Sequence, residues 1–264
     1  MNSTATTSAD ISLHLAWFNA YAAAKRAQEQ GDASPLDLKL RHSLEVLENA
    51  RHTVEGEGFD PQTARVCLLA ALYHDVGRFE QYLRYHTFRD RESRNHGQMG
   101  VRVLKAERRL VNECPQTRKL VMAAVGMHNR FALPKGTPAN IALITNVVRD
   151  ADKLDILRVM DEHLSGPAPY NPTVVLQQPD DPTIASAAIL KAVREQRVAA
   201  YVDLRCVNDF RLLLGTWFFD LHFASSRRKF IEDCHAQNLL RCMPDNVPQA
   251  EARDFLLHIL ENAQ

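Results

Sequence analysis

Residues 62–82 read QTARVCLLAALYHDVGRFEQY. The first half of this stretch is apolar almost all round, which predicts a buried central helix over 62–74. This helix ends in the adjacent polar pair His74-Asp75. Other groups must satisfy these two side chains, because burying them unpaired is costly. The stretch therefore predicts an interior helix whose end contributes to a polar site.

Helical periodicity continues on both sides of this stretch. Leu40, Leu44, Leu47 and Val54 recur at intervals of roughly three or four, as the core-facing stripe of a helix does. Further helices are expected over five segments: 96–112, 116–128, 140–164, 184–205 and 208–237. Few segments alternate with period two, so we expect an all-α protein without a sheet.

Composition argues for a soluble protein without a general attraction to polyanions. Of 264 residues, 45% are apolar, and 32 basic side chains balance 32 acidic ones. Any attraction to a charged ligand must therefore be local. Five scattered cysteines without a CxxC pair indicate reduced thiols. No signal peptide or membrane-spanning stretch is evident, so we expect a cytoplasmic protein.

One proline-rich segment divides the chain. SGPAPYNPTVVLQQPDDPT, residues 165–183, holds five of the twelve prolines and predicts a long loop. We expect a helical extension at 1–35 and a metal-binding core at 36–164. After the loop at 165–183, we expect a C-terminal helical subdomain at 184–264 that packs on the core.

The pair His74-Asp75 could bind a cation together with two residues elsewhere in the chain. Adjacent helical residues point about 100° apart, so the pair shares a cation only near the helix end, with further ligands from other segments. His42 lies on the preceding helix and Asp152 in RDADKLD, residues 149–155. Two imidazoles and two carboxylates suit Mn²⁺, Fe²⁺, Co²⁺, Ni²⁺ or Zn²⁺. Spacing alone leaves the neighbouring Asp150 and Asp155 as alternatives to Asp152.

Two more histidines extend this set. His96 in NHGQMG and His128 in GMHNRF could hold a second ion, with Asp75 bridging the two ions through its two oxygens. Equally, both could be surface residues or hydrogen-bond partners of loops. The residues leave one ion and two ions open.

Basic side chains gather near the pair. Five arginines fall between 78 and 94, and guanidinium groups suit phosphate oxygens. Arg78, Arg89, Arg94 and Lys153 are the expected phosphate-binding residues. Lys153 directly follows Asp152 and could also stabilise charge on a transferred phosphoryl group. A salt bridge to Asp150 or another carboxylate is the alternative.

The order His42, His74-Asp75, Asp152 resembles the HD-domain superfamily. The local sequences also match, with an apolar helix before the pair, Gly77 after it, and an Asp-Ala-Asp-Lys-Leu-Asp string at the end. The resemblance covers about 36–164 and implies a helical bundle related to the phosphodiesterase catalytic core, here with additional C-terminal helices. In the family pattern the last ligand is the Asp before Lys, which is Asp152.

The resemblance implies a metal-dependent phosphohydrolase, acting on a nucleotide or a small phosphomonoester. One or two divalent ions (Mn, Fe, Co, Ni, Zn or Mg) would bind through His42, His74, Asp75, Asp152, His96 and His128. Asp75, His96, His128 and Lys153 are the expected catalytic residues, with His96 and His128 acting as ligands or as general acid. We expect no membrane partner and no specific nucleic-acid partner, and a homodimer is left open.

Other members suggest alternatives. The segment MHNRFALPKGTP has a single His and no Gly-Tyr-Pro, unlike the HD-GYP cyclic dinucleotide phosphodiesterases. Six ligands in the order His, His-Asp, His, His, Asp also occur in di-iron oxygenases of this superfamily. A non-catalytic, metal-containing sensing module is a third reading.

Overall fold

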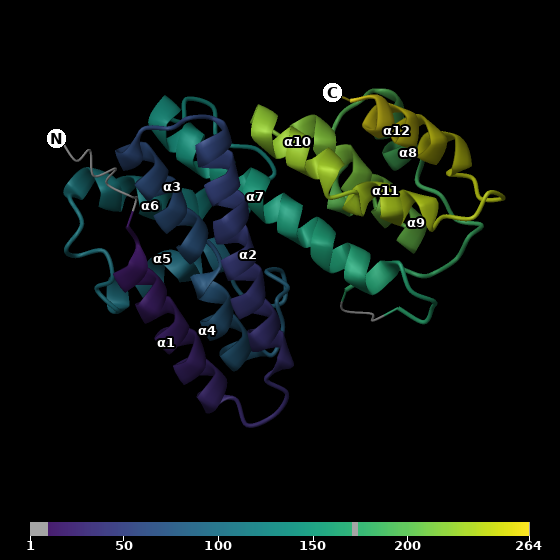
Figure 1. The fold of residues 1–264 in the computed structure, drawn as a ribbon. Coiled ribbons are helices and arrows are strands. Elements are labelled where there is room, and N and C mark those ends of the chain that lie inside the picture. The colour runs from purple at the N-terminus through teal and green to yellow at the C-terminus, as the bar shows by residue number, and fades with distance from the viewer. Residues whose placement is uncertain (1–9, 171–173, 264) are drawn as a thin grey trace. The chain divides into compact units, whose positions relative to one another are not determined.

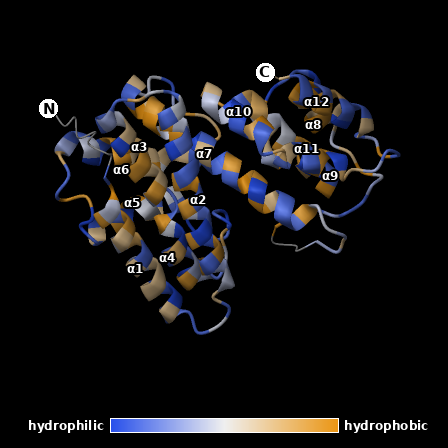
Figure 2. Cartoon of the chain, viewed as in Figure 1, coloured by the Kyte–Doolittle hydropathy of each residue, from blue (hydrophilic) through white to orange (hydrophobic). Residues whose placement is uncertain are grey.

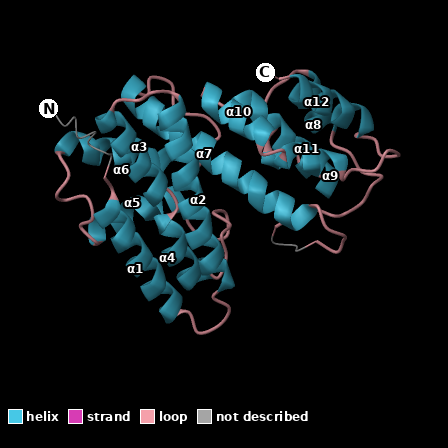
Figure 3. Ribbon diagram, in the orientation of Figure 1, coloured by secondary structure: helices cyan, strands magenta, loops and turns pink. Residues whose placement is uncertain are grey.

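The computed structural model describes residues 10–170 and 174–263. Every regular element in these two ranges is a helix and none is a strand, which confirms the all-α prediction (Figure 3). Within the same ranges, no helix combines the length and apolarity needed to span a bilayer. All five cysteines are free thiols.

The chain divides into two compact units, Met1–Asp152 and Lys153–Gln264, which are described separately. The boundary falls inside helix α7 (Ala139–Leu164), ahead of the proline-rich segment. The division expected at 36, 165 and 184 stays a prediction.

The N-terminal unit is a bundle centred on α3 (Figure 1). Helix α3 packs against α2 and α6, α4 packs against α5, and α5 packs against α6. Helix α1 contacts α2, α3 and α4, so it is part of this bundle. The helices span Ser12–Gln28 (α1), Ser34–Gly56 (α2), Pro61–Tyr73 (α3), Val76–Tyr85 (α4), His96–Ala106 (α5) and Pro115–Met127 (α6).

Helix α3 is the central helix that its apolar sequence predicts. Asp60 caps its start by accepting hydrogen bonds from the backbone N–H groups of Gln62 and Thr63. Its last six residues, 68–73, are at most 1% exposed. The helix ends at Tyr73, and α4 begins at Val76, so His74 and Asp75 form the turn between two buried helices.

Three glycines let α4, α5 and α6 approach closely. A Cβ atom on Gly77 would lie 2.4 Å from both the Gly100 nitrogen and the His96 carbonyl oxygen. A Cβ on Gly97 would lie 2.8 Å from the Val125 carbonyl oxygen. These distances exclude any larger residue without backbone movement. The glycine after the HD pair and the glycines of His96-Gly97-Gln98-Met99-Gly100 therefore bring His96 towards the turn after α3.

The C-terminal unit is built from shorter helices. They are α8 (Ala187–Arg194), α9 (Val207–Thr216), α10 (Ala224–Glu232), α11 (His235–Arg241) and α12 (Ala250–Asn262), with 3₁₀ turns at Tyr201–Asp203 and Trp217–Asp220. Hydrophobic and hydrophilic positions alternate around α9, α11 and α12 (Figure 2). The apolar positions form one core with the end of α7.

Three expected helix ends are wrong. The helix expected over 184–205 is α8 alone, because the chain turns at Gln196, which has a positive φ of 49°. The helix expected over 208–237 is interrupted by the 3₁₀ turn at 217–220 and again by Cys234, with φ 58°. Helix α5 ends at Ala106 rather than 112, ahead of Arg108 with φ 49°. Side-chain periodicity does not reveal these single left-handed residues.

Candidate metal centre

Three helices bring together a first cluster, His42, His74 and Asp152. His42 Nε2 lies 3.1 Å from Asp152 Oδ1 and 3.3 Å from His74 Nε2. The His74 Nε2–Asp152 Oδ1 distance is 3.7 Å. Both histidines are buried, and the Asp152 side chain is 20% exposed. One ligand atom from each residue lies within reach of a common cation.

A second cluster consists of His96 and His128. His96 is the first residue of α5, and His128 directly follows α6. Their Nε2 atoms are 3.1 Å apart, and both side chains are buried. The close packing of α4, α5 and α6 places this pair beside the turn that holds Asp75.

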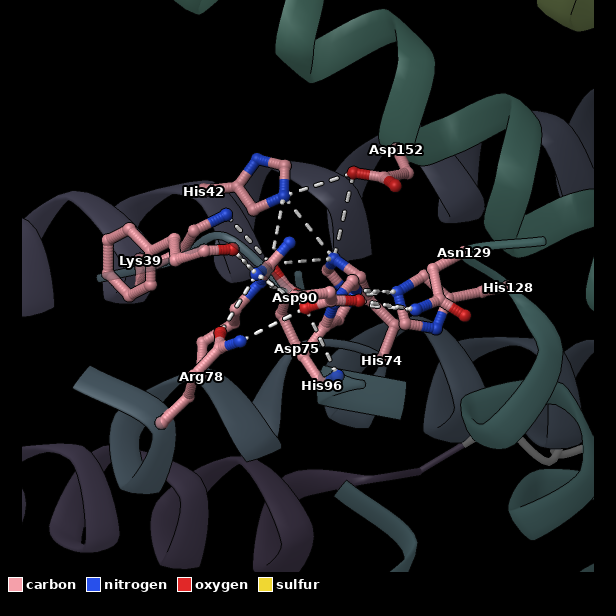
Figure 4. A network of polar contacts seen from close by, with 12 residues as sticks. Lys39, His42, His74, Asp75, Arg78, Asp90, His96, His128, Asn129 and Asp152 are labelled. Carbon is pink, nitrogen blue, oxygen red and sulfur yellow. Dashed lines mark hydrogen bonds and ion pairs between the residues drawn. The ribbon is translucent and has the colours of Figure 1, made fainter. Parts of the chain in front are cut away.

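Asp75 lies between the two clusters (Figure 4). Its Oδ2 atom is 3.6 Å from His42 Nε2 and 3.7 Å from His74 Nε2. Its Oδ1 atom is 3.5 Å from His96 Nε2 and 3.7 Å from His128 Nε2. Each carboxylate oxygen therefore faces a different pair of imidazoles, as a carboxylate that bridges two ions would.

In three of the imidazoles, the ring nitrogen that faces away from the centre, Nδ1, lies beside a hydrogen-bond acceptor. His74 Nδ1 is 2.7 Å from the Ala71 carbonyl oxygen, and His128 Nδ1 is 2.9 Å from that of Val125. His96 Nδ1 is 2.9 Å from both oxygens of Asp90. Because these oxygens accept hydrogen bonds, Nδ1 carries the proton and Nε2 presents a lone pair. Partners of this kind orient metal-binding histidines.

This protonation pattern tests whether the residues fit a metal. In the second cluster two Nε2 lone pairs face each other at 3.1 Å. Asp75 Oδ1 points at both; it is buried, and Arg78 Nε lies 3.4 Å from it without forming a hydrogen bond. Three acceptors thus converge without a donor among them, which is unfavourable unless a cation lies between them. These ligand atoms therefore fit a divalent ion.

Burial sets the charge of the centre. It lowers the pKa of His74 to about 4 and that of His96 to about 3. Burial opposes ionisation of Asp75, but Lys39 and Arg78 outweigh it and hold the pKa of this carboxyl well below its usual range. At neutral pH these imidazoles are neutral and Asp75 is charged, which are the forms that bind metal.

Three residues of the centre were not expected from the sequence. Lys39 Nζ lies 2.8 Å from Asp75 Oδ2. Asp90 holds His96, and Asn129 Nδ2 donates to Asp90 Oδ2 at 3.2 Å. Lys39 is one helical turn before His42 and Asn129 directly follows His128, so adjacency to ligands was an available signal. Asp90 had no signal, because it lies in a charge-rich segment that resembles a solvated loop.

The expected phosphate-binding arginines differ in their contacts. Arg78 Nε is 3.4 Å from Asp75 Oδ1, and its Nη1 donates to the Phe88 carbonyl oxygen at 2.5 Å. Arg89 pairs with Glu92, and Arg94 Nε donates to the Tyr85 hydroxyl. Among these three arginines, Arg78 alone contacts a residue of the centre. Their roles in phosphate binding stay predictions.

The string RDADKLD separates into different environments. Asp152 is the carboxylate that meets His42, whereas Asp155 accepts from Arg158 Nε at 2.6 Å. Lys153 Nζ contacts Asp220 Oδ2 at 2.5 Å and the Asp220 carbonyl oxygen at 3.0 Å. Lys153 thus makes a salt bridge to a carboxylate that the sequence did not single out. Its expected catalytic role stays a prediction.

Comparison with known proteins agrees with this geometry. The HD domain family model matches residues 40–157. No curated protein and no solved structure matches the chain. The matched range contains all six histidine and aspartate side chains of the two clusters and their bridge. Residues 40–157 therefore form an HD domain, the domain that defines the HD superfamily of metal-dependent hydrolases.

Proposed function

We propose that this protein is a metal-dependent phosphohydrolase acting on a nucleotide or a small phosphomonoester. One observation carries the proposal. Asp75 places one oxygen on each of two imidazole clusters, and the second of these contains acceptors without a donor. Paired ions joined by a carboxylate are typical of centres that hydrolyse phosphoesters.

The first ion would be held by His42, His74, Asp152 and Asp75, and the second by His96, His128 and Asp75. Mixed nitrogen and oxygen donors suit Mn²⁺, Fe²⁺, Co²⁺, Ni²⁺ or Zn²⁺ better than Mg²⁺. A bound divalent ion supplies a Lewis acid that polarises a phosphoryl oxygen and makes water a better nucleophile at neutral pH.

The histidines of the second cluster act as ligands rather than as general acids. His96 and His128 each direct Nδ1 at an acceptor, so Nε2 has no proton to give. Burial lowers the pKa of His96 to about 3, so very little of it is protonated at neutral pH. A general acid needs a pKa close to the working pH.

Two basic side chains lie where they would attract the negative charge of the substrate. Lys39 and Arg78 both contact Asp75, and the Phe88 ring lies 5.5 Å from Lys39 Nζ and 5.7 Å from the Arg78 guanidinium carbon. They place positive charge beside the centre, where it would attract a phosphate group. Arg89, Arg94 and Lys153 would extend this attraction by binding further phosphate oxygens.

A di-iron oxygenase is the second candidate. The observation that favours it is that His96 and His128 meet Asp75, because this completes the set of six ligands that such enzymes use. Both candidates fit a cytoplasmic protein that takes a small ligand from solution, as a monomer or a homodimer.

Elemental analysis and a phosphate-release screen test the proposal. The purified full chain would be loaded with Mn²⁺, Co²⁺, Ni²⁺ or Fe²⁺ and given nucleoside mono- and triphosphates and small phosphomonoesters under nitrogen. We expect phosphate release that His74→Ala abolishes. Turnover that requires both iron and oxygen, with no phosphate released from any substrate, would support the oxygenase instead.

A further inference from the structure

The loop between α4 and α5, residues 86–95, contributes one carboxylate to the centre. Asp90 lies 2.9 Å from His96 Nδ1 through each of its oxygens. We propose that Asp90 is a positioning residue that determines whether the second ion, at His96, His128 and Asp75 Oδ1, is bound. This inference rests on the metal centre of the proposed function, and it does not depend on the substrate.

His96 needs an outside acceptor because of its position in its helix. His74 and His128 each direct Nδ1 at the carbonyl oxygen three residues earlier, Ala71 and Val125, so α3 and α6 orient them. His96 is the first residue of α5, and the residues before it belong to the loop. No preceding helical turn can provide the same carbonyl oxygen. Asp90 takes its place.

The proton of His96 follows from this contact. An ionised carboxylate only accepts hydrogen bonds, so the proton of the neutral ring lies on Nδ1. The lone pair of Nε2 then points at His128 Nε2 and at Asp75 Oδ1, 3.1 Å and 3.5 Å away. If the ring rotated or changed tautomer, Nε2 would no longer complete the second cluster.

Asp90 is itself held by several donors. Gln81 Nε2 donates to its Oδ1 at 3.0 Å, and Asn129 Nδ2 donates to its Oδ2 at 3.2 Å. Gln81 is fully buried, and its Nε2 also lies 2.8 Å from Ser93 Oγ and 2.9 Å from the Arg94 carbonyl oxygen, so its two hydrogens are shared among three acceptors. Arg78 Nη1 is 3.4 Å away. These contacts fix the loop, and with it the carboxylate.

Asp90 contacts a ligand of the second cluster, which makes its expected effect selective. His42, His74 and Asp152 lie on α2, the α3 end and α7, and Asp90 interacts with the His96 side of the centre. Loss of the Asp90 charge should therefore weaken the binding of the second ion and leave the binding of the first unchanged. A carboxylate needed only for folding would affect both ions alike.

Titration of the metal-free full chain with Mn²⁺ tests this, followed by calorimetry and elemental analysis. We expect two ions per chain in the parent protein and in Glu92→Gln, which removes a charge from the same loop without contacting His96. In Asp90→Asn the first ion should bind unchanged, and the second should weaken by roughly 10–100-fold, as for other residues that orient metal ligands. Equal affinities for both ions in Asp90→Asn and the parent would overturn the proposal. A parent that saturates at one ion would also overturn it.

A second measurement needs no variant. The ¹⁵N shifts of the His96 ring in the metal-free parent should show the proton on Nδ1. A proton on Nε2 would contradict the proposed orientation. Neither measurement uses a substrate, so a protein that binds two ions as described yet releases no phosphate would refute the hydrolase and leave the role of Asp90 intact.

Discussion

The two clusters of the centre are built by different means. The first takes His42 and Asp152 from within α2 and α7 and His74 from the turn that follows α3, and its geometry follows from how these helices pack. The second takes His96 and His128 from the start of α5 and the end of α6, and it also needs a loop carboxylate and close glycine contacts. Two of the three ligands of the first cluster lie within packed helices and are fixed once the core forms, whereas both ligands of the second lie at helix ends and depend on what surrounds them.

This difference predicts that the two ions bind with unequal affinities. The first cluster offers three side chains in addition to Asp75, and the second offers two. Fewer ligands and a loop-dependent orientation should make the second ion the weaker and more exchangeable one.

Asp75→Asn should abolish the difference by removing both ions. The amide has one oxygen instead of two and no charge, so it cannot serve both clusters. We expect metal content near zero by elemental analysis and a decrease in phosphate release on the order of 1,000-fold. Asp37→Asn removes an exposed carboxylate from α2 and should bind metal like the parent. Retention of either ion at parental affinity would show that Asp75 is not the bridge.

Gly77→Ala should affect the second ion more than the first. The new Cβ would meet the backbone of Gly100 and His96 at 2.4 Å, so α4 and α5 must separate and displace His96. We expect a loss of roughly 1–3 kcal/mol or more in the free energy of unfolding. Denaturant unfolding and Mn²⁺ titration would measure these effects. The control is Gly126→Ala, whose Cβ would meet only a side-chain atom, at 3.4 Å. Equal weakening of both ions would contradict a selective effect.

Acid should destabilise the metal-free protein through both clusters. His74 and His96 have ordinary pKa values of 6.5 that burial lowers to about 4 and about 3. The unfolded chain therefore binds more protons below pH 6.5, and the free energy of unfolding falls with pH. Each histidine contributes about 1.4 kcal/mol per pH unit, down to its folded pKa. His74→Gln and His96→Gln should each reduce this slope, measured by unfolding at several pH values with chelator present. A parental slope in both variants would contradict this account.

Asn129→Ala should give the smallest effect, confined to the second ion. It removes one hydrogen bond to Asp90, while Gln81 and Arg78 still hold the carboxylate. A hydrogen bond to a charged group contributes about 1.5–3 kcal/mol, and the remaining donors to Asp90 should offset part of this loss, so the second ion should weaken by roughly 2–10-fold. Gln62→Ala removes a comparable bond, to Thr117, and should not change metal binding. Altered affinity for the first ion would show that Asn129 does not act through Asp90 and His96 alone.

Much of the fold could be predicted where local signals are strong. The apolar run before His74 predicts α3 to within one residue at each end, because a helix that is buried all round needs no particular partner. The C-terminal helices were predicted too long, since left-handed residues such as Gln196 and Cys234 have no side-chain signature. Asp90 could not be predicted either, because its partner His96 lies across a loop with no regular spacing.

The types and order of the ligands, and the position of His74-Asp75 at the end of a buried helix, can be read from the amino-acid sequence. The packing of the helices is needed to know that the two oxygens of Asp75 face different clusters, and that His96 and His128 present lone pairs to each other. Spacing along a helix fixes directions relative to that helix alone. The approach of α5 to α4 at Gly77 and Gly100, and the rotation of His96 set by Asp90, depend on contacts between distant segments.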